Sequence, residues 1–174
     1  MKIIEALKEL PLIEKRIAQM ISDINQYASL ISSEEPALGT EDAHKKKVKG
    51  LKQKAFDLIR HYEKIKNTLE KTNCKVVVEI EGVKKTIREW ITVRKDTGKL
   101  YSAVFDAFNI KHATDLLNSV RIDVTKEGVN VSLKRMYSED EIKQEREKSD
   151  LIISRIDAAL EVVNATTDLV EIIK

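Results

Sequence analysis

The sequence has little cysteine, proline and glycine, and each shortage excludes a class of protein. Cys74 is the single cysteine among 174 residues. One cysteine cannot form a disulfide within its own chain or build a cysteine zinc site, which excludes small disulfide-stapled folds and zinc fingers. Two prolines and five glycines leave little room for long irregular segments, so a mostly helical protein is favoured.

Long apolar runs are also missing. Charges recur every few positions in residues 1–9, which lack the apolar stretch of about 7–15 residues that a Sec signal peptide needs. No other window approaches the roughly 20 apolar residues of a membrane span. We therefore expect a soluble chain that is made in the cytoplasm without Sec export.

A catalytic signature is absent as well. The chain has no glycine-rich phosphate loop and no serine or cysteine nucleophile motif. Its three histidines, His44, His61 and His112, are not spaced to put two on one helical face. We expect no cofactor, no metal and no enzyme activity, and the alternative is an enzyme whose site lies between subunits.

What the sequence does contain is an apolar stripe over residues 10–31 that steps by three and four, the pattern of one face of a long helix. Pro11 is expected in the first turn of this helix, with residues 2–9 as a separate turn or a kinked lead-in. The stripe needs partner helices, and we predict self-association through it. The candidate residues are Ile13, Ile17, Met20, Ile24, Tyr27 and Ile31.

A second stripe predicts another long helix over 41–71, after a loop at 32–40. Thr40 is its expected N-cap. Two matched stripes joined by a short loop form an antiparallel helical hairpin.

The period then changes to that of strands. Residues 75–86 predict a small β-hairpin that turns at Glu81-Gly82, and residues 120–135 predict a second one. Because isolated hairpins are marginal, we expect them to pair with each other or with a neighbouring subunit.

A third helix is expected from Ile87, where Thr86 and Glu89 form a capping box. Residues 96–98 are a candidate interruption of this helix. Its predicted buried face consists of Trp90, Ile91, Leu100, Val104, Phe105 and Phe108.

The last long helix is expected over 139–163, opened by Ser138 and stopped by residues 164–168. Its predicted face consists of Ile142, Ser149, Ile152, Ile156, Ala159 and Val163. The apolar tail 169–173 needs a cover, either the bundle itself or another chain. The predicted fold is mainly α, an antiparallel long-helix bundle or coiled coil with one or two small β-hairpins at one end, forming a single elongated domain over 1–174.

Six lysines crowd the start of the second helix without an acidic residue between them: Lys45, Lys46, Lys47, Lys49, Lys52 and Lys54. Such a segment is a candidate site for anionic lipid or nucleic acid. A solvated helix start is the favoured interpretation, because the net charge is only +2 and no arginine or aromatic residue is interleaved.

Short motifs at both ends of the chain point to a family. They are Glu5-Ala6-Leu7, Glu34-Glu35-Pro36, Lys71-Thr72-Asn73, Thr86-Ile87-Arg88-Glu89, Tyr137-Ser138 and Asn164-Ala165-Thr166-Thr167-Asp168-Leu169. With these motifs the chain resembles the septicolysin-like family of uncharacterised bacterial and phage proteins. The resemblance implies an antiparallel helical bundle with a small hairpin, and the occurrence of the family in phages implies a virion or assembly role.

These observations lead to one functional expectation. We expect a non-enzymatic structural or assembly protein that forms a homo-oligomer, works with other assembly proteins and is a candidate component of a phage or phage-like particle. The alternative is a binder of anionic surfaces, membrane or nucleic acid, through the lysine segment.

Overall fold

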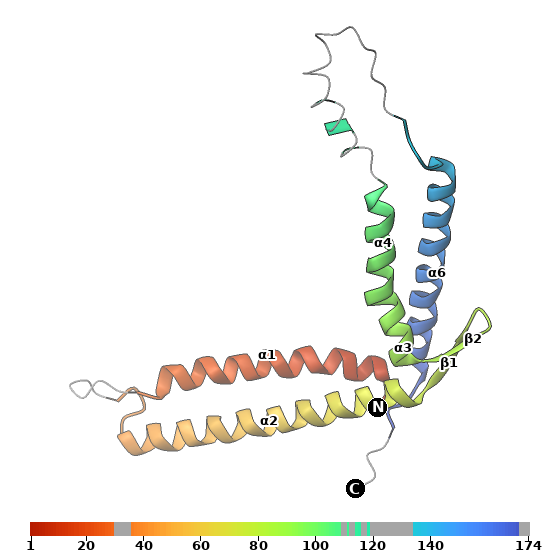
Figure 1. Ribbon diagram of the computed structural model, residues 1–174. Coiled ribbons are helices and arrows are strands. Elements are labelled where there is room, and N and C mark those ends of the chain that lie inside the picture. The colour runs from red at the N-terminus through yellow and green to blue at the C-terminus, as the bar shows by residue number, and fades with distance from the viewer. Residues whose placement is uncertain (30–35, 109–110, 112–113, 116–117, 119–133, 171–174) are drawn as a thin grey trace. The chain divides into compact units, whose positions relative to one another are not determined.

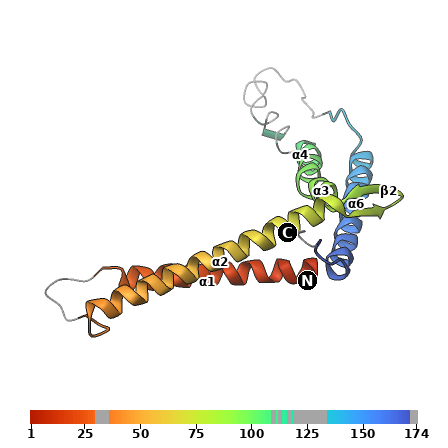
Figure 2. The ribbon, with the colours of Figure 1, turned by 90° about the horizontal axis from the view of Figure 1, so that it is seen from below.

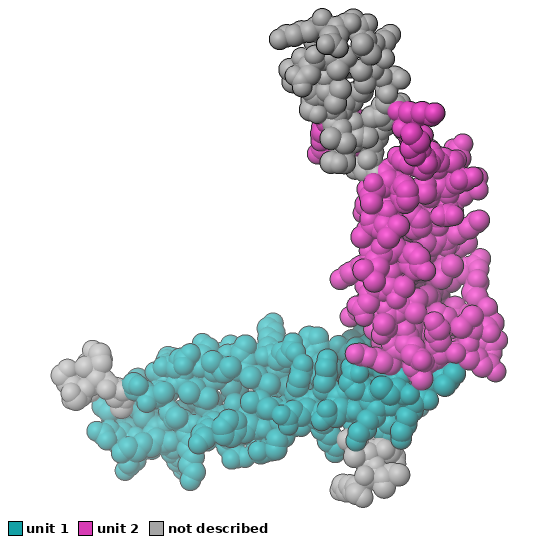
Figure 3. All heavy atoms as spheres, in the orientation of Figure 1, with its two compact units in different colours: residues 1–77, 161–174 teal, residues 78–160 magenta. Residues whose placement is uncertain are grey.

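The computed structural model describes residues 1–29, 36–108, 111, 114–115, 118 and 134–170. The chain divides into two units, each described by itself below: unit 1 comprises residues 1–77 and 161–174, and unit 2 comprises residues 78–160 (Figure 3). The protein is mainly α, as the periodicity predicts.

Unit 1 is built on two long helices, α1 (Ile3–Tyr27) and α2 (Glu41–Lys75), which lie side by side and run in opposite directions (Figures 1 and 2). The predicted helical hairpin is therefore confirmed. Thr40 caps α2 as expected, because its side chain accepts a hydrogen bond from the amide of Ala43 at 3.1 Å. The apolar core between the helices consists of Ile3, Ala6, Leu10, Ile13, Leu51, Ala55, Ile65 and Leu69.

The bounds of these helices correct three expectations. Pro11 does not separate a lead-in, since α1 is one helix from Ile3 onward. Pro11 is exposed, and the buried stripe runs past it on the other side of the helix, so packing holds both halves together despite the missing amide donor. The helix ends at Tyr27, and Ile31 lies outside the described residues.

The second helix, α2, is longer than predicted and continues to Lys75, and Thr72 and Asn73 in its last turns are buried.

The first residues of the chain meet residues 167–169 in unit 1. Lys2 and Asp168 form an isolated antiparallel β-bridge, in which the amide of Ile3 donates to Thr167 O at 3.0 Å. The amide of Leu169 donates to Met1 O at 2.8 Å. The half-buried start of the predicted tail thus folds back on its own chain, and residues 171–174 lie outside the described residues.

The first predicted β-hairpin is present as strands β1 (Val77–Ile80) and β2 (Val83–Thr86). Both turn residues have positive φ, 54° for Glu81 and 76° for Gly82, which suits the two-residue turn that matches strand twist. The second predicted hairpin, over 120–135, falls almost wholly on residues outside those described.

The predicted capping box of Thr86 and Glu89 is present directly after β2. The amide of Thr86 donates to Glu89 Oε2 at 2.7 Å, and the amide of Glu89 donates to Thr86 Oγ1 at 3.2 Å. These bonds satisfy helix-end donors and start α3 (Ile87–Thr92).

Residues 96–98 do not break the helical path. The chain passes from α3 through a π-helical turn, η1 (Val93–Thr97), into α4 (Gly98–Ala107). The amide of Gly98 bonds to Val93 O, five residues earlier, so the helix widens rather than stops.

The last helix, α6 (Glu139–Thr166), starts as predicted, with the amide of Glu141 donating to Ser138 Oγ at 3.3 Å. It ends three residues later than expected. Ile156 is fully buried, but the expected inward position of Ile152 is wrong, because this side chain is 49% exposed and Ile153 packs inward instead. The described core of unit 2 consists of Ile80, Ile87, Trp90, Ile156 and Leu160.

Candidate functional site

One hollow of unit 2 lies between α4 and α6, which run side by side in opposite directions (Figures 1 and 2). It has a volume of about 520 Å³. Tyr101, Phe105, Ile152 and Ile153 supply most of its apolar lining. Gly98 permits the close approach at its base, since a Cβ atom there would stand 3.2 Å from Ile153 Cδ1.

The apolar lining continues onto the outside of α4. Leu100, Tyr101, Val104 and Phe108 are 69%, 55%, 56% and 37% exposed, and their spacing of three and four residues puts them on one side of the helix. Together with Ile152 we call these residues the apolar patch. All ten residues of α4 are described, and none is buried.

The predicted burial of Leu100, Val104 and Phe108 is therefore wrong. Periodicity correctly indicated that these residues share a face, but α6 covers only the neighbouring face, which carries Gly98 and Phe105. Trp90 is buried as predicted, and its indole Nε1 donates to Val78 O at 3.0 Å.

Two ion pairs join α6 to η1 and to α4. Arg94 Nη1 lies 2.9 Å from Asp157 Oδ1, and Arg146 pairs with Asp106 nearer the other end of α4. Phe108 at that end is fixed by Tyr137, whose hydroxyl donates to Phe108 O at 2.7 Å. The patch is thus presented on helices that are tied by long-range contacts.

The rim of the hollow carries both signs of charge. Lys85 and Lys148 supply ammonium groups, and Glu145 supplies a carboxylate one turn before Lys148. An apolar floor with a mixed-charge rim suits a protein partner better than a small charged substrate.

The self-association stripe predicted on α1 packs against α2 of the same chain. Ile13 is 1% exposed and offers no surface to a partner. Ile17, Met20, Ile24 and Tyr27 are half-buried, so part of each side chain faces outward. Self-association through this stripe stays a prediction.

The six predicted anion-binding lysines are all exposed but do not share one surface. Lys45 is 3.3 Å from Glu41 and 3.8 Å from Asp42. Lys47 lies over the ring of Tyr27, and Lys52 lies over the ring of Phe56. Lys46, Lys49 and Lys54 form no ion pair with any described residue.

The histidines have structural surroundings where they are described. His61 lies on the surface, with Nε2 2.9 Å from Glu9 Oε1. His44 is 4% exposed; its Nε2 accepts the amide of Leu38 at 3.1 Å, and its buried Nδ1 has no hydrogen-bond partner. His112 lies outside the described residues.

Two pKa shifts have local causes. The hydrogen bond to the Glu14 carboxylate, 2.8 Å away, raises the pKa of Tyr62. The amide and hydroxyl of Thr86 lower the pKa of Glu89 by stabilising its carboxylate. Both groups join secondary-structure elements and need no catalytic explanation.

The described residues contain no cluster of three histidine, cysteine or acidic side chains that is arranged to hold a metal ion. No helix among them is both long and apolar enough to cross a membrane. Cys74, near the end of α2, is exposed and carries a free thiol.

The chain was compared with known proteins at three levels. No family model, no curated protein and no solved structure matches it.

Proposed function

We propose that the protein is a non-enzymatic assembly protein that associates with a second copy of itself through the apolar patch of α4 and α6. The exposure of this patch supports the proposal: three large side chains on α4, Phe108 directly after it and Ile152 on α6 stay in contact with water. Contiguous exposed apolar surfaces of this kind mark interaction sites.

A second copy is the occupant that the charges favour. Glu145 and Lys148 stand one turn apart on the same rim, so a two-fold axis brings the carboxylate of one rim to the ammonium of the other. Each copy contributes an antiparallel pair of helices, and two such pairs complete a four-helix bundle. The apolar side chains of both copies then share one core.

The resemblance to septicolysin-like proteins is compatible with this role. Incorporation into a phage or phage-like particle, with other assembly proteins as partners, is implied by that resemblance alone and stays a prediction.

The test is the mass of the full chain in solution, measured by light scattering over a tenfold range of concentration. We expect a multiple of 19.9 kDa. Val104→Asp puts a charge into the apolar contact, which costs several kcal/mol and weakens association more than about 100-fold. The variant should run as a folded monomer, because Val104 is 56% exposed and supports no core.

Ser102→Asp is the matched control. It adds the same charge to an exposed position on another side of α4, so it should leave the multimer intact. A wild-type monomer at every concentration contradicts the proposal, and so does a Val104→Asp variant with unchanged mass.

A further inference from the structure

Charge is unevenly distributed among the helices, although the chain as a whole is almost neutral. Helix α2 carries eleven lysines and arginines against five acidic residues, a net charge of +6, whereas α6 carries four against eight, a net charge of −4. Such a concentration of one sign on a single helix attracts polyanions.

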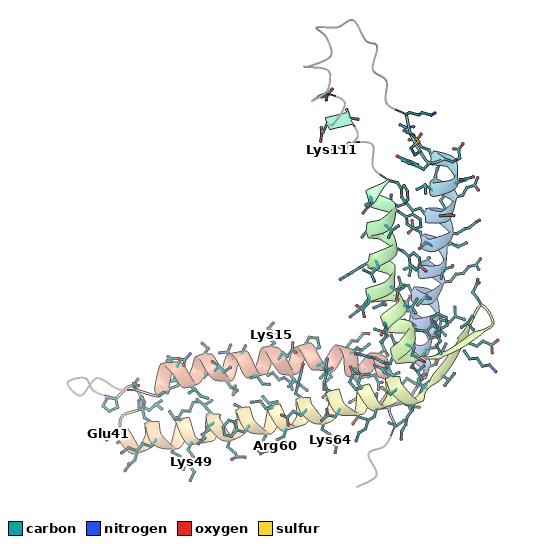
Figure 4. All side chains as sticks on the ribbon, viewed as in Figure 1. Lys15, Glu41, Lys49, Arg60, Lys64 and Lys111 are labelled. Carbon is teal, nitrogen blue, oxygen red and sulfur yellow. The ribbon has the colours of Figure 1, made fainter. Side chains whose placement is uncertain are left out.

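Part of the charge on α2 forms a line. Lys46, Lys49, Arg60, Lys64 and Lys71 are separated by 3, 11, 4 and 7 residues, and each of these steps returns to the same side of an α-helix. We call this set the basic ridge. Figure 4 shows Lys49, Arg60 and Lys64 projecting from α2 on the side away from α1. At 1.5 Å per residue the ridge is about 38 Å long.

The ridge is solvent-exposed and mostly unneutralised. Lys46, Lys49, Lys64 and Lys71 form no ion pair within the part of the chain that the structure describes. Arg60 pairs with Asp57, which also accepts a hydrogen bond from Gln53 at 3.1 Å. Four lysines therefore remain to contact an anionic partner.

An aromatic ring stands within the ridge. Phe56 is 47% exposed and lies two turns after Lys49 and one turn before Arg60, on the same side of the helix. The ammonium of Lys52 lies 5.7 Å from the centre of this ring. The lysine segment predicted from the sequence ends at Lys54, so it contains neither Phe56 nor Arg60, which follows Phe56 by one turn. The sequence analysis therefore did not find this arrangement.

We infer that the basic ridge binds nucleic acid, with the lysines on phosphates and a base stacked on Phe56. A line of cations with an exposed ring is the combination found in proteins that bind single strands without sequence preference. A single strand exposes its bases for stacking, so it should bind more tightly than a duplex of equal length.

A membrane surface fits these observations less well. A helix that lies in a lipid interface inserts a wide apolar face. The apolar stripe of α2, which includes Leu51 and Leu69, is buried in unit 1. The large apolar side chains that α2 leaves exposed are Phe56 and, three residues later, Ile59, and two side chains do not form such a face.

The test uses a fluorescent oligothymidylate of about 20 nucleotides and the full-length protein, with binding followed by anisotropy. Four phosphate contacts predict that affinity falls about 50-fold between about 50 and 200 mM salt. Replacing Lys46, Lys49 and Lys64 together by Gln should reduce that salt dependence to roughly that of one contact. Phe56→Ala should weaken binding by between about 5-fold and 150-fold.

The control replaces three exposed lysines on other helices, Lys8, Lys15 and Lys99, by Gln. Lys15 projects from α1 on the side away from α2 in Figure 4. This variant has the same net charge as the ridge variant, and we expect it to bind like the wild type.

Several results would overturn the inference. They are no binding of the oligonucleotide by the wild type at low salt, equal losses in the ridge and control variants, and unchanged affinity after Phe56→Ala. Retention on vesicles of phosphatidylserine and phosphatidylcholine without oligonucleotide binding would assign the ridge to membranes instead. The inference is independent of self-association, because Val104→Asp should lower the mass in light scattering and leave the intrinsic affinity of each ridge unchanged.

Discussion

Thr72 joins the C-terminal segment to α2, and replacing it by valine tests that attachment. The side chain is fully buried; its hydroxyl donates to Thr68 O at 2.8 Å and accepts the amide of Val170 at 3.0 Å. Valine keeps the branched shape and removes both bonds. The carbonyl of Thr68 stays within a helix, whereas the half-buried amide of Val170 loses the partner that the structure gives it.

The expected loss follows from that orphaned donor. A buried donor without a partner costs about 1–3 kcal/mol, so we expect Thr72→Val to lower the free energy of unfolding by about 2 kcal/mol. With a urea dependence of about 2 kcal/mol per molar, the unfolding midpoint measured by circular dichroism should fall by about 1 M. Hydrogen exchange at the amide of Val170 should become faster in the same variant.

Thr68→Val is the matched control. Thr68 is 8% exposed on the same helix, and its hydroxyl makes only the bond to Lys64 O at 2.7 Å. This variant should lose less than about 1 kcal/mol. If both variants lose the same stability and the amide of Val170 exchanges as slowly as in the wild type, the attachment through Thr72 is wrong.

Three further predictions concern unit 2. Trp90→Phe should cost about 1–3 kcal/mol in urea unfolding, because Val78 O loses the indole donor and the buried site loses volume. Gly82→Ala should cost about 1–2 kcal/mol in the same assay, since φ is 76° there. Glu89→Gln should destabilise the protein at neutral pH, because folding lowers the pKa of the Glu89 carboxyl. The stability that the carboxylate contributes is fully present above the pKa of the unfolded state and disappears as the pH falls through the pKa of the folded state. Urea unfolding should therefore show a difference in stability between variant and wild type at neutral pH that becomes smaller at acidic pH.

Local signals predicted the helix starts and the first hairpin well. Thr40, Thr86 and Ser138 all accept the backbone donors expected of them, because a cap depends on residues within one turn. The turn at Glu81-Gly82 is equally local. Helix ends were less predictable. The last turns of α2, which ends at Lys75, include the buried Thr72, and its hydroxyl accepts the amide of Val170, far away in sequence.

The surface of α4 shows what periodicity leaves undetermined. Leu100, Val104 and Phe108 share a face whether or not anything covers it, so the pattern predicts a need for burial and not its partner. In the structure α6 packs against the neighbouring face of α4, where Gly98 allows close contact with Ile153. The candidate assembly surface follows from this difference between expected and observed burial.

Net charge is a poor guide to partners when charges are segregated by helix. A total of +2 argues against binding of anions only if both signs are mixed on every surface. Three carboxylates share this side of α2, because Asp42 lies four residues before Lys46, and Asp57 and Glu63 lie three residues before and after Arg60. Asp42 pairs with Lys45 and Asp57 pairs with Arg60, whereas Lys46, Lys49 and Lys64 form no ion pair among the described residues. The charge on one face of a helix is therefore a better guide to an anionic partner than the net charge of the chain. The lysine segment alone does not define that face, because Arg60, Lys64 and Lys71 lie well beyond it in sequence and on the same side of α2.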